Sequence, residues 1–157
     1  MIKAWYFSRE NKKLRYSDNR IIRTGITHKV KCEPILCEAG LHGSRKILDA
    51  LSYAPGAYVW RVELSGEIIR GADKIAATER KYLWGYDSSD ILRRFGRLCA
   101  LDVLHLWEAP AIVIEYLKTG NESIRAAARD AARAAARDTA IIKQNNRLTQ
   151  MIIKNRP

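Results

Sequence analysis

The sequence predicts an α+β protein, with a small antiparallel sheet and a short helix followed by a helical C-terminal half that ends in a long Ala/Arg-rich helix. Two observations carry this prediction. Apolar side chains recur every second residue before residue 87, as in half-buried strands, and every third or fourth residue after residue 88, as in helices. We expect a sheet domain over residues 1–87 and a helical region over residues 88–157, packed on the sheet domain or on a second subunit.

The first predicted elements are short strands and one helix. Residues 3–8 alternate as a strand that places Trp5 and Phe7 on one face. Two further short strands are expected at residues 14–16 and 21–22. Ser44 is a preferred N-cap residue, so a helix is predicted from residue 45 to residue 53, burying Ile47, Leu48 and Leu51.

The middle of the chain predicts a hairpin. Residues 58–64 alternate clearly, so we expect one buried face made of Tyr58, Trp60, Val62 and Leu64. Ser65 and Gly66 predict a tight turn into a partner strand over residues 67–70. A further strand is expected to place three aromatic residues on one face: Tyr82, Trp84 and Tyr86.

The second half predicts helices. After residue 88 an apolar stripe steps by three and four residues, and we expect its second half to be buried. The stripe consists of Leu92, Phe95, Cys99, Val103 and Leu106. A short helix over residues 111–117 is favoured over a strand, because Gly120 suits a C-cap. Alanine and arginine then predict a helix over residues 122–154, with Asn145 and Asn146 as the place where it bends or stops.

The charge of the chain lies at its two ends. Its formal net charge is +11 over 157 residues. Residues 1–31 hold nine Lys and Arg against two acids, residues 32–119 hold eleven against twelve, and residues 120–157 hold eight against three. Basic ends on a neutral middle predict attraction to a polyanion, such as a nucleic acid or a nucleoprotein.

The candidate partner-binding residues are an arginine row in the final helix: Arg125, Arg129, Arg133 and Arg137. A spacing of four turns each side chain by about 40° from the one before it, so the row stays on one side of the helix along about 18 Å. Arginine forms charge-assisted hydrogen bonds to phosphate or carboxylate. The alternative is a solvated face, in which Glu122 and Asp130 neutralise Arg125 and Arg133.

Small and apolar residues lie opposite the arginine row and predict a helix-packing seam. They are Ile124, Ala128, Ala131, Ala135, Ile142 and Ile153. The seam would meet the helix that carries the apolar stripe, or a second copy of the chain in a homodimer.

The N-terminal basic residues alternate with Trp5, Tyr6 and Tyr16, which is one way to hold single-stranded nucleic acid. The alternative is aromatic residues in the core and solvated cations. The basic residues are Lys12, Lys13, Arg15, Arg20, Arg23, Lys29 and Lys31.

Four residues of metal-ligating types fall close together but without zinc-knuckle spacing: His28, Cys32, Cys37 and His42. We therefore favour free thiols over a zinc site and predict no metal. Cys37 and His42 are a weak nucleophile–base pair, and neither a phosphate-binding glycine loop nor a carboxylate pair stands out. We predict no catalytic residues, no cofactor and no enzymatic activity. The first residues lack the apolar segment of a secretory signal and no run is long enough to span a bilayer, which predicts a cytoplasmic protein with no membrane partner.

The segment Cys-Glu-Ala-Gly-Leu-His-Gly-Ser at residues 37–44, with the predicted helix and strand after it, resembles a family of phage and prophage proteins. Those proteins carry a Cys-x-x-Gly-(Phe or Leu)-His stretch and often an Ala/Arg-rich tail. The likeness covers residues 32–85 and 117–139. It implies a phage origin, and small basic phage proteins without a catalytic set resemble those that disable host defences by binding, such as inhibitors of CRISPR–Cas complexes.

A second resemblance is to the ADP-ribosyltransferase fold. Its Gly-x-x-x-Ser segment and Ala-x-x-Tyr-Ala helix end are similar to Gly40 to Ser44 and Ala50 to Ala54 here. The first strand lacks the His or Arg that grips the NAD ribose in that fold, so the resemblance implies an inactive or repurposed relative.

These observations lead to one expected function and two alternatives. We expect a phage-encoded, non-enzymatic binding protein in the host cytoplasm that inhibits a host nucleic-acid-handling defence complex of the CRISPR–Cas type through its basic surfaces. The alternatives are direct binding of DNA or RNA and, implied by the second resemblance alone, ADP-ribosyl transfer.

Overall fold

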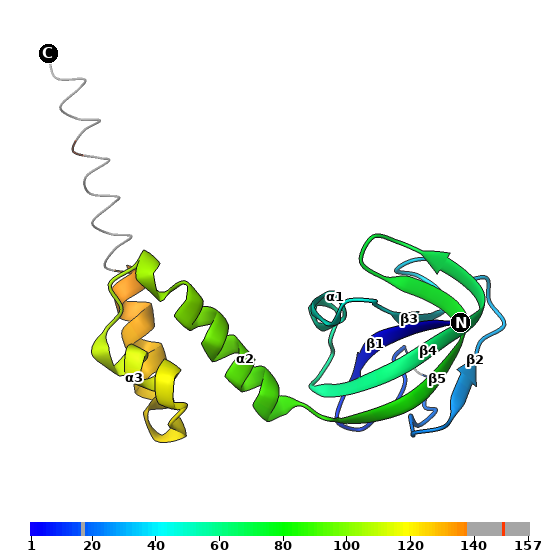
Figure 1. The fold of residues 1–157 in the computed structure, drawn as a ribbon, viewed down its shortest axis with the longest axis horizontal. Coiled ribbons are helices and arrows are strands. Elements are labelled where there is room, and N and C mark those ends of the chain that lie inside the picture. The colour runs from blue at the N-terminus through cyan, green and yellow to red at the C-terminus, as the bar shows by residue number, and fades with distance from the viewer. Residues whose placement is uncertain (17, 138–148, 150–157) are drawn as a thin grey trace, which may run out of the picture. The chain divides into compact units, whose positions relative to one another are not determined.

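The computed structural model describes residues 1–16, 18–137 and 149 and confirms an α+β fold (Figure 1). The chain divides into two compact units, Met1–Leu92 and Arg93–Pro157. The first unit holds the sheet, and the second is helical wherever it has regular structure among the described residues.

The sheet of the first unit is antiparallel and closes on itself. Its strands are β1 (Ile2–Ser8), β2 (Thr27–Lys29), β3 (Leu41–Gly43), β4 (Tyr58–Arg70) and β5 (Ile75–Asp87). They are ordered β1-β4-β5-β2, and β3 also pairs with β5 (Figure 1). Directly after β3, Ser44 exchanges two backbone hydrogen bonds with Trp5 of β1, at 2.7 and 2.9 Å between N and O. This pair joins the end of β3 to β1, so the curved sheet encloses its core.

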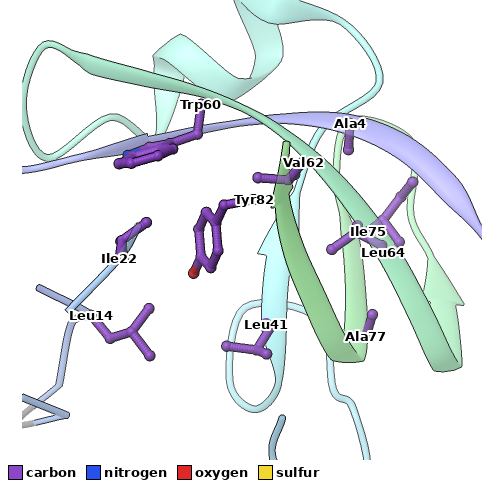
Figure 2. Packing of buried hydrophobic residues seen from close by; sticks show 10 residues of the cluster. All are labelled: Ala4, Leu14, Ile22, Leu41, Trp60, Val62, Leu64, Ile75, Ala77 and Tyr82. Atoms are coloured by element: carbon purple, nitrogen blue, oxygen red, sulfur yellow. The ribbon is translucent and has the colours of Figure 1, made fainter. Parts of the chain in front are cut away.

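The core contains the face of β4 that its alternation predicts, because Trp60, Val62 and Leu64 are all buried. Figure 2 shows the Tyr82 ring in the middle of this cluster, and the ring of Trp60 meets it edge-on with the centroids 5.4 Å apart. Two residues of the N-terminal loops, Leu14 and Ile22, complete the cluster. The short strands expected around 14–16 and 21–22 are reduced to one isolated bridge between Lys13 and Ile21.

A smaller cluster forms where Ala50 of α1 (Ile47–Ser52) packs with Phe7 and Val59 of the sheet. The helix predicted from residue 45 with Ser44 as its N-cap is wrong at its start. Ser44 is held in extended backbone by its pairing with Trp5, so the helix begins only after Lys46. The later start also changes which residues the helix buries, so Ile47 and Leu48, which were predicted to be buried, are exposed.

The predicted turn at Ser65–Gly66 is also wrong. β4 continues through it as a bulge, where Gly66 takes a φ of +74° that favours glycine, and the chain turns instead between Gly71 and Lys74. A second irregularity near Arg61 leaves Leu83 without a partner. This bulge reverses the faces of β5, so that Tyr82 points into the core while Trp84 and Tyr86 are exposed.

The second unit begins within α2 (Ser89–Asp102) and continues through η1 (Leu104–Leu106), α3 (Ala111–Thr119) and η2 (Glu122–Ile124). The expected burial of the later part of the apolar stripe is wrong, because α2 ends at Asp102 and Leu106 is 71% exposed. The short helix and its cap are confirmed, since Gly120 takes a left-handed φ of +69° and donates to Tyr116.

The start of the final helix is confirmed, because the Asn121 side chain accepts a hydrogen bond from the Ser123 backbone at 3.0 Å and residues 125–137 are helical. The predicted bend at Asn145–Asn146 and the remainder to residue 154 lie outside the described residues.

Candidate functional site

The arginine row lies on the outside of the helical segment 125–137, and all four of its side chains are exposed. Arg125 pairs with Glu122 and Arg129 pairs with Asp130, each at 3.3 Å. Asp130 therefore neutralises Arg129 instead of Arg133. Within the segments that the structure describes, Arg133 and Arg137 have no acidic partner. Partner binding by the row stays a prediction.

The opposite side of the same helix carries the predicted seam. Ala128 is buried, and Ile124, Ala131 and Ala135 are half-buried. The other two seam residues, Ile142 and Ile153, lie outside the described residues. Self-association through this helix stays a prediction.

The N-terminal aromatic residues do not form one surface. Tyr16 is 86% exposed, with the Arg15 guanidinium 5.0 Å from its ring centre. Trp5 packs edge-on against Trp84, with ring centres 5.7 Å apart. Tyr6 is covered by the guanidinium of Arg80.

An aromatic pair that the alternation placed on the same face as Tyr82 lies on the opposite, exposed face of β5. The rings of Trp84 and Tyr86 are stacked 6.1 Å apart at 13°, and each residue is close to half exposed. Arg61 lies over the neighbouring Trp5 ring at 4.6 Å. Sequence reasoning missed this surface because the bulge at Leu83 reverses the side on which β5 presents its residues.

The four candidate metal-ligating residues, His28, Cys32, Cys37 and His42, are not brought together to hold a metal ion. His28 is buried, and its Nδ1 lies 3.3 Å from the hydroxyl of Tyr82. The three cysteines are free and exposed. Among the residues described, no group of three or more His, Cys, Asp and Glu side chains is arranged to hold a metal ion.

A cavity of about 560 Å³ in the first unit is lined by a buried positively charged side chain, that of Arg80. Arg80 is only 2% exposed, because β5 pairs it with Leu64 on one side and His28 on the other. Its Nε donates to the Tyr82 hydroxyl at 2.9 Å, and its Nη1 donates to the His42 carbonyl at 2.5 Å.

The charges around Arg80 are mostly positive. Lys74 and Arg15 also line the cavity. Its two acidic lining residues are Asp18 and Glu38, and Asp18 is already paired with Arg20 at 2.6 Å. His42 lines the cavity too, and its Nε2 is enclosed without a hydrogen-bond partner. Burial lowers the pKa of His42; backbone hydrogen bonds to Ile35 and Gly40 oppose this, and the positive charges of Arg80 and Lys74 add to it.

A second group of polar side chains lies at the more exposed part of the lining. The Nζ of Lys74 is 3.1 Å from the Sγ of Cys37 and 3.6 Å from the ring centre of Tyr53. The Tyr53 hydroxyl donates to Asp73, which holds the pKa of that carboxyl below its usual value. The weak pairing of Cys37 with His42 is replaced here by a contact of Cys37 with Lys74.

The residues that carry the resemblance to the ADP-ribosyltransferase fold make separate structural contacts. Ser44 is buried and its backbone is hydrogen-bonded to Trp5 of β1, whereas the Tyr53 hydroxyl donates to Asp73. Sequence reasoning missed Arg80 altogether. The signal that could have found it is its spacing of two from Tyr82, which puts a charged residue on the inward face of a strand.

Residues 11–94, just over half of the chain, match the model of a family described as Domain of unknown function (DUF7666). The match begins in the N-terminal loops, covers the cavity-lining segments from Leu14 onward and ends early in α2. No curated protein and no solved structure matches the chain. None of the helices in the described residues is both long and apolar enough to cross a membrane.

Proposed function

We propose that this chain, which belongs to the DUF7666 family, is a phage-encoded, non-enzymatic binding protein that inhibits a host nucleic-acid-handling defence complex of the CRISPR–Cas type. The observation that supports the proposal is the exposed arginine row, of which Arg133 and Arg137 have no acidic partner in the described parts of the chain. Phage origin, action in the host cytoplasm and the class of target rest on the sequence resemblance to phage and prophage proteins.

The physical basis of the proposal is the ability of unpaired guanidinium groups to bind phosphate or carboxylate groups in two-pronged, charge-assisted hydrogen bonds. The exposed ion pairs at Arg125 and Arg129 contribute little, about 0–1 kcal/mol each, so these arginines can exchange an internal acid for an external one. A helix that carries such a row can lie along the phosphate backbone of the nucleic acid that a defence complex holds, or along an acidic surface elsewhere on that complex.

The test is charge reversal of the two arginines that have no acidic partner among the described residues, Arg133→Glu with Arg137→Glu. The full chain with both changes is expected to bind a purified CRISPR surveillance complex at least about tenfold more weakly and to lose its inhibition of target-DNA binding, because two favourable ionic contacts become repulsive. Titration calorimetry measures the first effect and a DNA-capture assay the second. Circular dichroism checks that the variant stays folded.

The matched control reverses Arg94 and Lys118, which are exposed in the same unit. It makes the same change in net charge away from the row and is expected to bind like the natural chain. Inhibition that survives the Arg133/Arg137 reversal contradicts the proposal. Equal losses in both variants would attribute binding to net charge instead of the row.

Direct binding of single-stranded nucleic acid is the second candidate, and the exposed Trp84–Tyr86 stack beside Arg61 favours it. Exposed aromatic rings next to cations stack bases, and each stacked base contributes about 1–3 kcal/mol. Replacing Trp84 with Ala is then expected to weaken binding of a labelled oligonucleotide about tenfold, measured by fluorescence anisotropy, with the affinity falling steeply as salt rises. Trp107→Ala removes an exposed tryptophan of the second unit and serves as the control. Absence of binding at low salt removes this candidate.

A further inference from the structure

We propose that the cavity around Arg80 binds a small organic oxyanion, with Arg80 and Lys74 as its cationic partners. The first argument is the state of Arg80. A guanidinium stays charged at every physiological pH, and burying it without a counter-charge is strongly unfavourable. Yet Arg80 is almost completely buried, and its polar contacts in the described part of the chain are a phenol and a carbonyl, with the Tyr6 ring 3.7 Å away.

These contacts leave donors unused. They engage Nε and Nη1, whereas Nη2 has no acceptor in the part of the chain that is described. Arginine places its five N–H groups in a fixed fork, so an acceptor for Nη2 must come from one direction. Among the described residues, no carboxylate is bonded to Arg80. An anion in the cavity would supply both the acceptor for Nη2 and the missing counter-charge.

The second argument is independent and comes from His42. Its Nε2 is shielded from solvent and lacks a partner, although buried polar atoms are normally hydrogen-bonded. His42 lies in the same lining as Arg80 and accepts the Arg80 hydrogen bond through its own carbonyl. An oxyanion beside Arg80 would place a negative charge close to this imidazole, which otherwise lies near the positive charges of Arg80 and Lys74.

The size and lining of the cavity indicate the class of ligand. A volume of about 560 Å³ falls within the range of small-molecule sites, about 300–1,000 Å³, and exceeds the space that a bare inorganic ion needs. Lys74 adds a mobile cation to the fixed fork of Arg80. Apolar residues of the lining, Leu14, Val30 and Leu41, are available to an organic body. The ligand is therefore a phosphate ester or carboxylate attached to a carbon skeleton.

The experiment is an NMR titration of the full chain in which the imidazole signals of His42 are followed. Three probes are compared: inorganic phosphate, adenosine monophosphate and succinate. We expect saturable shifts of the His42 signals with an organic probe and a rise in the pKa of His42, because an added anion stabilises its protonated form. The signals of His105, which is outside the first unit, are expected to stay in place. Adenosine monophosphate and succinate distinguish a phosphate from a carboxylate ligand.

Single-residue variants distinguish specific binding in the cavity from non-specific attraction of the anionic probe to a basic protein. Lys74→Gln is expected to weaken binding of the organic probe about tenfold, the effect of one charge-assisted contact. Lys81→Gln removes the same charge from the exposed residue next to Arg80 and is expected to change affinity less than about twofold. Arg80→Gln is expected to abolish binding if circular dichroism shows it folded, and Lys74→Gln carries the test if it does not.

Three outcomes overturn the proposal. In the first, no probe moves the His42 signals; in the second, only inorganic phosphate moves them; in the third, Lys74→Gln and Lys81→Gln weaken binding equally. The result does not depend on the proposed docking function. The chain with Arg133 and Arg137 reversed is expected to bind the organic probe as the natural chain does, because those residues are outside the first unit.

Discussion

Replacing Trp60 with alanine is expected to lower the free energy of unfolding by about 4 kcal/mol, which is within the range for truncating a buried aromatic residue. Trp60 is 2% exposed, and its ring lies 4.9 Å from that of Tyr58 and 5.4 Å from that of Tyr82. Its Nε1 also donates to the hydroxyl of the buried Ser8 at 3.0 Å. The substitution therefore opens a cavity in the core and removes a buried hydrogen bond between β1 and β4.

Urea denaturation followed by circular dichroism measures this loss. Trp84→Ala provides the control, because Trp84 is on the neighbouring strand but 45% exposed, and its loss is expected to stay below about 1.5 kcal/mol. Equal losses for the two tryptophans would contradict the position of Trp60 at the centre of the core.

Replacing Gly85 with alanine is expected to lower the free energy of unfolding by about 2–3 kcal/mol through overpacking. An added Cβ would lie 2.5 Å from Cδ2 of Trp60 and 2.7 Å from the carbonyl oxygen of Val59. The Val59 oxygen belongs to the backbone of β4 and cannot turn away, so the two central strands must shift.

Gly96→Ala is the matched control for Gly85→Ala and is expected to have the opposite sign. A Cβ at Gly96 meets nothing within 4 Å, and alanine stabilises a helix interior by about 1 kcal/mol relative to glycine. Adding Gly85→Ala to the Trp60→Ala variant is expected to cost less than it does in the natural chain, because one of the two clashes disappears. An equal cost in both backgrounds would contradict the close approach of Gly85 to Trp60.

The sequence was sufficient to predict those elements in which the spacing of apolar residues determines which side chains are buried. The alternation from Tyr58 to Leu64 predicted the inward face of β4, and Gly120 predicted the end of α3. It was insufficient where non-local pairing overrides a local preference. Ser44 is a good N-cap by type, yet its pairing with Trp5 keeps it in the sheet, and a bulge at Leu83 turns Trp84 outward.

The same distinction applies to the candidate sites. The exposure of the arginine row follows from helical geometry within one segment, so the sequence could predict it. The cavity draws on β1, β3, β5 and the loops between them, and no local pattern relates Arg80 to His42 or Lys74. Only the inward position of Arg80 among apolar neighbours could have indicated it, and that position depends on the two bulges that set the register of β5.

The pair between Trp5 and Ser44 has a consequence for the behaviour of the chain at high concentration. An open sheet margin offers a row of unpaired amide groups to which a strand of another molecule can attach, which is a common start of aggregation. Here the amide and carbonyl of both residues are already satisfied within one molecule. Intermolecular strand addition is therefore blocked at this pair of residues, and protection at this point does not depend on the repulsion between positive charges, which a bound polyanion would cancel.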